Sequence, residues 1–218
     1  MGESFAFGYL LFLFKGASWT VGLSSIALIC GGLLALIVAL CRISALNWLR
    51  LAMALYIQII QGTPVLVLMF LIYFGLPSIG WSVSPLVAAS VSLSVYVSAY
   101  LGESWRGAIQ SVPRAQWEAA ECLALSRTQR MMKVVLPQAV RIATPPTVGF
   151  MVQIIKNTSL ASVVGFVELV RAGQIVNNTI FQPFLIYMLI AVLYFSMCYP
   201  LSIFSRRLEA RAGDKSYA

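Results

Sequence analysis

Five long apolar segments constrain what this chain can fold into more than any other feature of the sequence. A bilayer core about 30 Å thick is crossed by about 20 consecutive apolar residues in an α-helix. The chain offers such segments near residues 19–41, 51–76, 85–104, 142–166 and 184–204. Hydrophobic residues make up 60% of the sequence and charged residues only 10%, well outside the usual mix of soluble domains. We therefore expect an all-α integral membrane protein with five transmembrane helices, in which residues 1–218 form a single transmembrane domain.

The first fourteen residues carry a separate apolar run, from Phe5 to Phe14, that is too short to span a bilayer. Glu3 precedes this run, where a signal peptide would carry positive charge. We expect an interfacial helix that stays on the mature protein.

Basic residues are concentrated between alternate spans. Lys15 and Arg171 fall on one face of the predicted topology. Twelve of the fifteen lysine and arginine residues fall on the other face: Arg42, Arg50, Arg106, Arg114, Arg127, Arg130, Lys133, Arg141, Arg206, Arg207, Arg211 and Lys215. By the positive-inside rule the second face is cytoplasmic, so the N-terminus is expected outside and the C-terminus inside. Because the charge follows the topology and no soluble basic domain exists, the sequence gives no support for nucleic-acid binding.

Residues for metal or hydrolytic chemistry are scarce. The sequence has no histidine, and its four cysteines form no pair at metal-ligand spacing. We therefore expect four free thiols, no metal site, no Ser-His-Asp triad and no cofactor in this chain. A membrane-embedded enzyme would have only Lys156 and Glu103 as a candidate pair, and that reading stays open.

A polar, basic stretch near residues 112–138 separates two apolar spans. Pro113 suits the first turn of a short helix, and Ser126 followed by Gln129 has the form of a capping box that starts a second helix. We expect the second helix to end at Leu136, because Pro137 disfavours helix in the residue before it. This pair of helices either docks a soluble protein or merely links two spans and rests on anionic membrane lipid.

The residues of this stretch resemble a known motif. The matching segments are Trp117-Glu118-Ala119-Ala120, Leu123-Ala124-Leu125-Ser126 and Val135-Leu136-Pro137-Gln138-Ala139. They resemble the EAA loop of permeases of type I ABC importers, whose Glu-Ala-Ala helix docks into a cleft of a cytoplasmic ATPase dimer. The resemblance implies that ATP-Mg binds in the partner ATPase, and that coupling runs through Glu118, Ala119, Ala120, Ala124, Ser126 and Pro137. The chain departs from the family at Ala124, where glycine is usual.

Further segments resemble the polar amino-acid permeases within this family, and they cover nearly the whole chain. They are Gln61-Gly62-Thr63-Pro64, Tyr73-Phe74-Gly75-Leu76-Pro77, Ala99-Tyr100-Leu101-Gly102-Glu103, Arg106-Gly107 and Ile155-Lys156-Asn157-Thr158-Ser159-Leu160. This resemblance implies a bacterial inner-membrane location, an amino-acid substrate, a second permease and an extracytoplasmic solute-binding protein. Gln61 stands where arginine is common, and Asn157 stands where aspartate is common.

Polar residues inside apolar spans indicate where a substrate pathway lies, because polar groups facing lipid are costly. Gly62 and Pro64 interrupt the second span and free backbone groups that only protein or a water-filled cavity can satisfy. Glu103 and Lys156 are candidates for the ammonium and the carboxylate of an amino acid, or Glu103 forms a structural ion pair with Arg106 or Lys156. The full set of candidate pathway residues is Gln58, Gln61, Gly62, Thr63, Pro64, Tyr100, Glu103, Gln153, Lys156, Asn157, Thr158 and Ser159.

Five helices give half of a pathway, so the chain is expected to pair with a second copy or a related permease. Nothing in it resembles a phosphate-binding loop, so ATP hydrolysis is expected in a partner and not here. The predicted function is the permease subunit of an ATP-driven amino-acid importer. The alternatives are an assembly half, whose partner permease holds the substrate, or an ATP-independent amino-acid channel. Residues 168–178 would lie outside, either as a contact for the binding protein or as a solvated connecting helix.

Overall fold

The computed structural model describes residues 2–213, with side chains for 7–210, so Lys215 and the side chains of Glu3, Phe5 and Arg211 lie outside the described residues. The described part is helical and contains no strand. Its elements are α1 (Gly2–Ile43), α2 (Asn47–Gly62), α3 (Val65–Phe70), η1 (Leu71–Gly75), α4 (Leu76–Ser78), α5 (Pro85–Gln110), α6 (Arg114–Cys122), α7 (Arg127–Arg130), η2 (Met131–Val135), α8 (Leu136–Asn157), η3 (Thr158–Ser162), α9 (Leu169–Ile180) and α10 (Pro183–Gly213).

The N-terminal apolar run is the first part of α1 and not a separate interfacial helix. The first 43 residues contain no proline, and an unbroken helix satisfies its backbone groups without water. The prediction of a short helix before residue 19 was therefore wrong. α1 has 42 residues, about 63 Å at 1.5 Å per residue, so it is longer than a bilayer core is thick.

Within the described residues, three helices are long and apolar enough to cross a membrane: Phe7–Ile43, Pro85–Gln110 and Pro183–Ala210. A fourth span is possible if Asn47–Gly62 and Val65–Ser78 count as one, although the two halves are bent by 101°. The predicted span 142–166 overlaps α8, which carries Arg141 and Lys156 and does not pass the same test of length and composition. The number of five spans thus stays a prediction.

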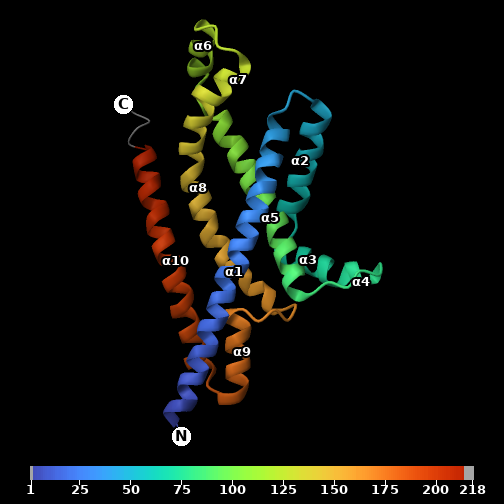
Figure 1. Cartoon of the computed structure of the whole chain (residues 1–218), viewed down its shortest axis with the longest axis vertical. Coiled ribbons are helices and arrows are strands. Elements are labelled where there is room, and N and C mark those ends of the chain that lie inside the picture. Colours follow the sequence, from blue (N-terminus) through green and yellow to red (C-terminus); the bar gives the residue numbers. More distant parts are fainter. Residues whose placement is uncertain (1, 214–218) are drawn as a thin grey trace.

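The break in the second span has a local cause. Pro64 has no backbone N–H and disfavours the helical conformation of Thr63, which is extended at φ −109° and ψ 130°. α2 therefore stops at Gly62, and α3 and α4 run away from the other helices to one side (Figure 1). The interruption expected near Gly62 and Pro64 is confirmed, but residues 51–76 do not form one straight helix.

α1 and α5 cross in close contact, because glycines remove the side chains at the crossing. A Cβ atom added at Gly31 would lie 2.5 Å from Cβ of Val97, and one at Gly102 would lie 2.7 Å from Cγ1 of Val38. Small residues that let backbones approach are the common device for packing helices in membranes. We call this contact the glycine seam.

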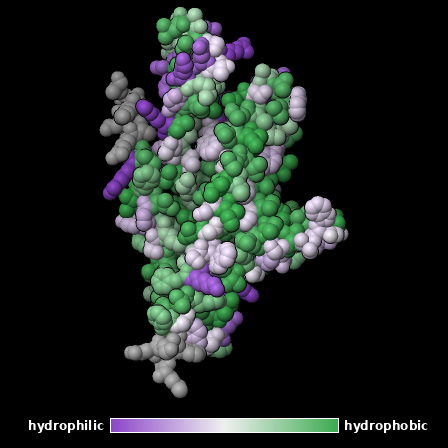
Figure 2. Space-filling model, in the orientation of Figure 1, coloured by the Kyte–Doolittle hydropathy of each residue, from purple (hydrophilic) through white to green (hydrophobic). Residues whose placement is uncertain are grey.

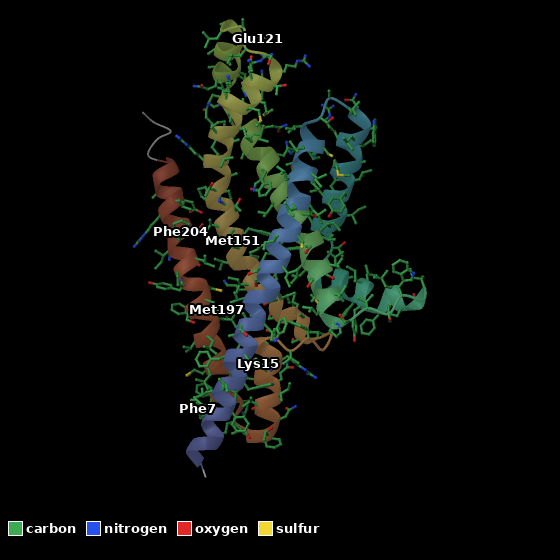
Figure 3. All side chains as sticks on the ribbon, viewed as in Figure 1. Phe7, Lys15, Glu121, Met151, Met197 and Phe204 are labelled. Carbon is green, nitrogen blue, oxygen red and sulfur yellow. The ribbon has the colours of Figure 1, made fainter. Side chains whose placement is uncertain are left out.

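The opposite side of α5 packs against α8, and α8 packs in turn against α10 (Figure 1). The hairpin of α6 and α7 extends beyond the helix bundle at one end, and α9 lies at the other end beside the start of α1. Lys15 and Glu121 mark these two ends (Figure 3). Hydrophilic residues gather over the α6–α7 end, while the body of the molecule is mostly hydrophobic on the face shown in Figure 2.

Candidate functional site

The α6–α7 hairpin is built by local backbone chemistry. The N–H of Ala124 donates to the carbonyl of Glu121 at 2.8 Å, and the N–H of Leu125 donates to the carbonyl of Ala120 at 3.2 Å. These two bonds form a Schellman motif, which ends α6. Two residues later the Ser126 hydroxyl accepts from the N–H of Gln129, whose side chain accepts from the N–H of Ser126, so the predicted capping box is confirmed.

Ala124 occupies the one position of the hairpin that favours glycine. Its φ of 54° lies in the left-handed region, where an L-residue with a Cβ atom is disfavoured. A helix that ends in a Schellman motif usually has glycine at this position. The departure from the family pattern at Ala124 therefore leaves the turn intact, at the cost of backbone strain.

A small apolar cluster anchors the hairpin to the end of the bundle. Trp117 packs against Val112, Val135 and Ala139. Ala120 is only 3% exposed, so its side chain also faces inward. Its role in coupling stays a prediction. The coupling candidates with exposed side chains are Glu118, Ala119, Ala124, Ser126 and Pro137.

The helix does not break at Pro137, and that prediction was also wrong. α7, η2 and α8 follow one another without an interruption, and Pro137 lies in the first turn of α8. η2 is a π-turn, whose wider spacing changes the hydrogen-bond ladder at the point where proline removes a donor. The hairpin is therefore joined to α8 by continuous helix.

Charges on the hairpin are partly paired. Arg130 Nη1 lies 2.9 Å from Glu121 Oε2, which ties α7 to α6. Arg127 and Lys133 are exposed, so these two cations of the basic stretch lie on its surface. Exposed Glu118 has no ion pair among the contacts described for residues 7–210.

A second cluster of polar and aromatic residues lies between α5 and α8. The ring centroids of Tyr96 and Tyr100 are 4.4 Å apart, and the ring of Phe150 stacks on Tyr100 at 5.4 Å. On α8, Gln153 lies one turn and Asn157 two turns beyond Phe150. Gln153 Nε2 donates to Asn157 Oδ1 at 3.3 Å. By helical spacing, Tyr96 and Tyr100 lie on the side of α5 away from the glycine seam. We call these five residues the polar face.

Glu103 lies on the same side of α5 but is held by two arginines. Arg106 donates from Nε to Oε2 at 2.9 Å and from Nη2 to Oε1 at 2.5 Å. Arg42 of α1 approaches Oε2 to 3.5 Å and also donates to the backbone carbonyl of Arg50 in α2. Of the two readings of Glu103, the structure shows the ion pair with Arg106.

Lys156 is not the partner of Glu103. Trp105 Nε1 donates to Thr147 Oγ1 at 2.9 Å, so Glu103 lies near the middle of α8. Lys156 stands nine residues beyond Thr147, about two and a half helical turns or roughly 13 Å at 1.5 Å per residue. Its side chain is exposed, and no ion pair or side-chain hydrogen bond is described for it within residues 7–210.

Several other candidate pathway residues have no described contact with the polar face. Thr158 is fully buried and its hydroxyl donates to the carbonyl of Ile155, while Ser159 donates to the carbonyl of Lys156. Thr63 donates to the carbonyl of Ile59. Exposed residues at the break of the second span are Gln58, Gln61, Gly62 and Pro64, and no described contact joins them to the polar face.

Sequence reasoning missed two contributors. Phe150 lies three residues before Gln153, on the same side of α8, so helical spacing could have found it. The approach of Arg42 to Glu103 joins residues far apart in sequence, and no local pattern predicts it.

A cavity of about 370 Å³ lies elsewhere, between α1, α5 and α8. Its lining includes Leu36, Leu40, Trp105, Val140 and Thr144, and it has no charged side chain. A zwitterion would lose its hydration there without gaining a charged partner, so this cavity is a poor site for one.

Glu168, at the end of the molecule opposite the hairpin, is fully buried. Its carboxylate accepts from the N–H groups of Val170 and Arg171, both at 2.9 Å, and from the hydroxyl of Tyr194 at 3.0 Å. It caps α9, so Glu168 itself is shielded from solvent, while Arg171 and Asn178 on the same helix are exposed. Burial raises the pKa of Glu168 above its ordinary value of 4.5, and the hydrogen bonds oppose this effect only in part.

No group of three or more His, Cys, Asp or Glu side chains that could hold a metal ion occurs among the described residues. The geometry thus defines a helical membrane protein with a polar hairpin at one end and a polar face between two helices.

The comparisons with known proteins agree with this class. Residues 31–214 match the family described as "Binding-protein-dependent transport system inner membrane component", and the chain belongs to that family. It is 36% identical to a probable amino-acid ABC transporter permease, YckA, of Bacillus subtilis (strain 168), over 92% of this chain and 88% of the relative. It is 34% identical to a probable glutamine permease, GlnM, of the same organism, over the full length of both chains.

Solved structures show the same fold. The crystal structure of an amino acid ABC transporter with histidines matches with a TM-score of 0.90 at 32% identity, over 94% of this chain and 96% of that one. A structure of the MetNI methionine ABC transporter matches with a TM-score of 0.72 at 17% identity, and this second likeness concerns the fold alone.

The chain is therefore a multi-pass inner-membrane permease subunit of an ATP-driven importer. It is a transport subunit and not an enzyme, because the ATPase of such an importer is a separate subunit. Membership in the family implies an ATPase partner, another permease and a substrate-binding protein.

Proposed function

We propose that this chain carries an amino acid across the cytoplasmic membrane of a bacterium, as one half of a permease pair. Relatives named as amino-acid, glutamine and cystine permeases support this substrate class. The observation that carries the proposal is the polar face, because polar side chains between otherwise apolar helices mark a substrate pathway. The second half is a second copy of this chain or a related permease, placed about a two-fold axis normal to the membrane.

The proposed orientation has the N-terminus outside and the C-terminus in the cytoplasm, with spans near 19–41, 51–76, 85–104, 142–166 and 184–204. The cations of the hairpin support it, since Arg114, Arg127, Arg130 and Lys133 gather at one end of the molecule. The α6–α7 hairpin, within residues 112–138, then lies in the cytoplasm. α9 lies on the outer side, where a solute-binding protein delivers its cargo.

The hairpin is proposed to dock on a dimer of cytoplasmic ATPases that bind ATP-Mg. Glu118 and Ala119 are exposed on α6, and the Schellman motif and capping box fix the angle at which α7 follows. Trp117 and the cluster beneath it resist displacement of the hairpin relative to the bundle. Closure of the ATPases on ATP moves the hairpin, and the membrane helices change between outward-open and inward-open arrangements.

The test is to purify the tagged chain with its native partners and to measure ATP hydrolysis, with and without Glu118→Lys. The variant is expected to lose the copurified ATPase, because it reverses a charge on the docking surface. Glu209→Lys makes the same change at an exposed position of α10 and is expected to keep the ATPase. A folded wild-type chain that is recovered without any ATPase would refute the proposed coupling and favour the ATP-independent channel.

One observation favours the assembly half as a second candidate. Glu103 is paired with Arg106 and Arg42, so the acid expected to hold the substrate ammonium is already neutralised. In that case the partner permease holds the substrate, and substitutions at Gln153 and Asn157 leave transport unchanged. Uptake by the intact complex carrying Gln153→Ala or Asn157→Ala separates the two candidates.

A further inference from the structure

The acidic residues of the chain are few enough to place one by one. The sequence has seven, and the side chains of Glu3 and Asp214 lie outside the described part. Glu118 and Glu121 belong to the hairpin, and Glu209 lies on α10 near its C-terminal end. Glu168 is buried as the cap of α9. Among the described side chains, Glu103 is therefore the one acid on the pathway side of α5.

Glu103 offers no free charge to a substrate. Arg106 holds both carboxylate oxygens in a two-point contact, and Arg42 approaches the same group from α1. Two-point pairs between arginine and carboxylate are among the strongest charged hydrogen bonds, so a substrate cation would have to displace a better partner. With Arg42 included, the cluster of one carboxylate and two guanidinium groups carries a net positive charge.

Lys156, in contrast to Glu103, has a charge that no described ion pair neutralises. It is exposed on α8 next to Asn157, and no ion pair or side-chain hydrogen bond is described for it within residues 7–210. Its neighbours on α8 are the neutral amides of Gln153, one turn before it, and of Asn157, and Cys198 of α10 lies close enough to feel its charge. A lysine ammonium in such a setting attracts a carboxylate and repels a second cation.

We infer that the polar face selects amino acids whose side chain is neutral or acidic and rejects those whose side chain is cationic. This inference rests on the proposed function and names the substrate class of the same site. The substrate carboxylate pairs with Lys156. The substrate ammonium meets the amide oxygens of Gln153 and Asn157 and the tyrosine rings, which attract cations through their π faces. A guanidinium or lysine side chain would add a cation where no unpaired anion is described.

The experiment measures equilibrium binding of radiolabelled glutamine, glutamate and arginine to the purified permease–ATPase complex, in the absence of any binding protein. We expect arginine to bind at least about tenfold more weakly than whichever of glutamine and glutamate binds more tightly. A tenfold difference in affinity is about the contribution of one charged interaction. Asn157→Asp places an anion beside Lys156, and it is expected to raise arginine affinity about tenfold and to weaken glutamate binding.

Asn178→Asp is the matched control, because it makes the same substitution at an exposed position of α9 away from the polar face. It is expected to leave all three affinities unchanged. Gln153→Glu serves as a second variant at an exposed position, in case Asn157→Asp does not fold. It is expected to shift selectivity in the same direction.

Two results would overturn the inference: wild-type complex that binds arginine as tightly as glutamine, or equal effects of Asn157→Asp and Asn178→Asp. Failure of the proposed function looks different. A folded complex that neither binds nor takes up any of the three amino acids refutes the amino-acid importer itself, and the inference falls with it.

Discussion

Replacing Gly31 by alanine tests the glycine seam between α1 and α5. A Cβ atom at this position would lie 2.5 Å from Cβ of Val97 and 2.7 Å from the backbone carbonyl oxygen of Ser94. Carbon atoms in ordinary contact are about 3.5–4.0 Å apart, so the two helices must separate by roughly 1 Å. Neither obstacle can move by a rotamer change, because one is a Cβ atom and the other is backbone.

Gly32→Ala is the matched control, because a Cβ atom at Gly32 meets nothing within 4 Å. Both variants gain the same helix propensity, up to about 1 kcal/mol. Only Gly31→Ala suffers overpacking, which costs about 1–3 kcal/mol. The difference between the two variants therefore isolates the overpacking cost. For a chain of this size 1 kcal/mol shifts the melting temperature by about 2–4 °C, so Gly31→Ala should melt roughly 2–12 °C below Gly32→Ala.

The assay is thermal unfolding of the detergent-solubilised protein, followed by intrinsic tryptophan fluorescence. Gly102→Ala provides an independent test at the other end of the seam, where the added Cβ would lie 2.7 Å from Cγ1 of Val38. Its melting temperature, like that of Gly31→Ala, is expected to lie below that of Gly32→Ala. Equal melting temperatures for Gly31→Ala and Gly32→Ala would show that the close approach of α1 and α5 does not exist.

Two further predictions concern the ends of the molecule. Ala124→Gly should stabilise the hairpin by about 0.5–1 kcal/mol, because the strain of a left-handed alanine outweighs the added freedom of glycine in the unfolded chain. Amide hydrogen exchange in α6 should then slow by about two- to fivefold, and unchanged or faster exchange would contradict the assigned conformation. At the other end, the pKa of Glu168 is raised by burial, so the folded state binds its proton more tightly than the unfolded state does. That contribution to stability is complete below the ordinary value of 4.5 and is lost as pH rises through the folded pKa. Melting temperature against pH should therefore be flatter for Glu168→Gln than for wild type, and parallel curves would count against a buried, titrating carboxylate.

Features set by neighbours in sequence could be predicted. The capping box needs only Ser126 and Gln129 at the right spacing, and the break at Gly62 follows from the missing N–H of Pro64. The class of membrane protein follows from apolar segments alone. In each case the determining chemistry lies within one or two helical turns.

Features set by tertiary contacts could not be predicted from the sequence. Pro137 is a poor residue for an uninterrupted helix, yet a π-turn before it accommodates the missing donor. Glu103 has Arg106 within reach on its own helix, but Arg42 comes from α1 and requires the glycine seam to bring the helices together. Ala120 looks like an exposed small residue until the cluster around Trp117 covers that side of α6.

The unbroken run of helix from Arg127 to Asn157 forms one arm about 45 Å long, with the hairpin at one end and the polar face at the other. Pro145 and Pro146 lie inside it, and both lack the N–H that would bond the preceding turn. The carbonyls of Arg141 and Ile142 thereby lose their backbone donors, and the hydroxyls of Thr144 and Thr147 bond the neighbouring carbonyls of Val140 and Ala143 instead. This turn is therefore weaker than its neighbours. The displacement of the hairpin that we propose would therefore reach Gln153 and Asn157 through this weakened turn.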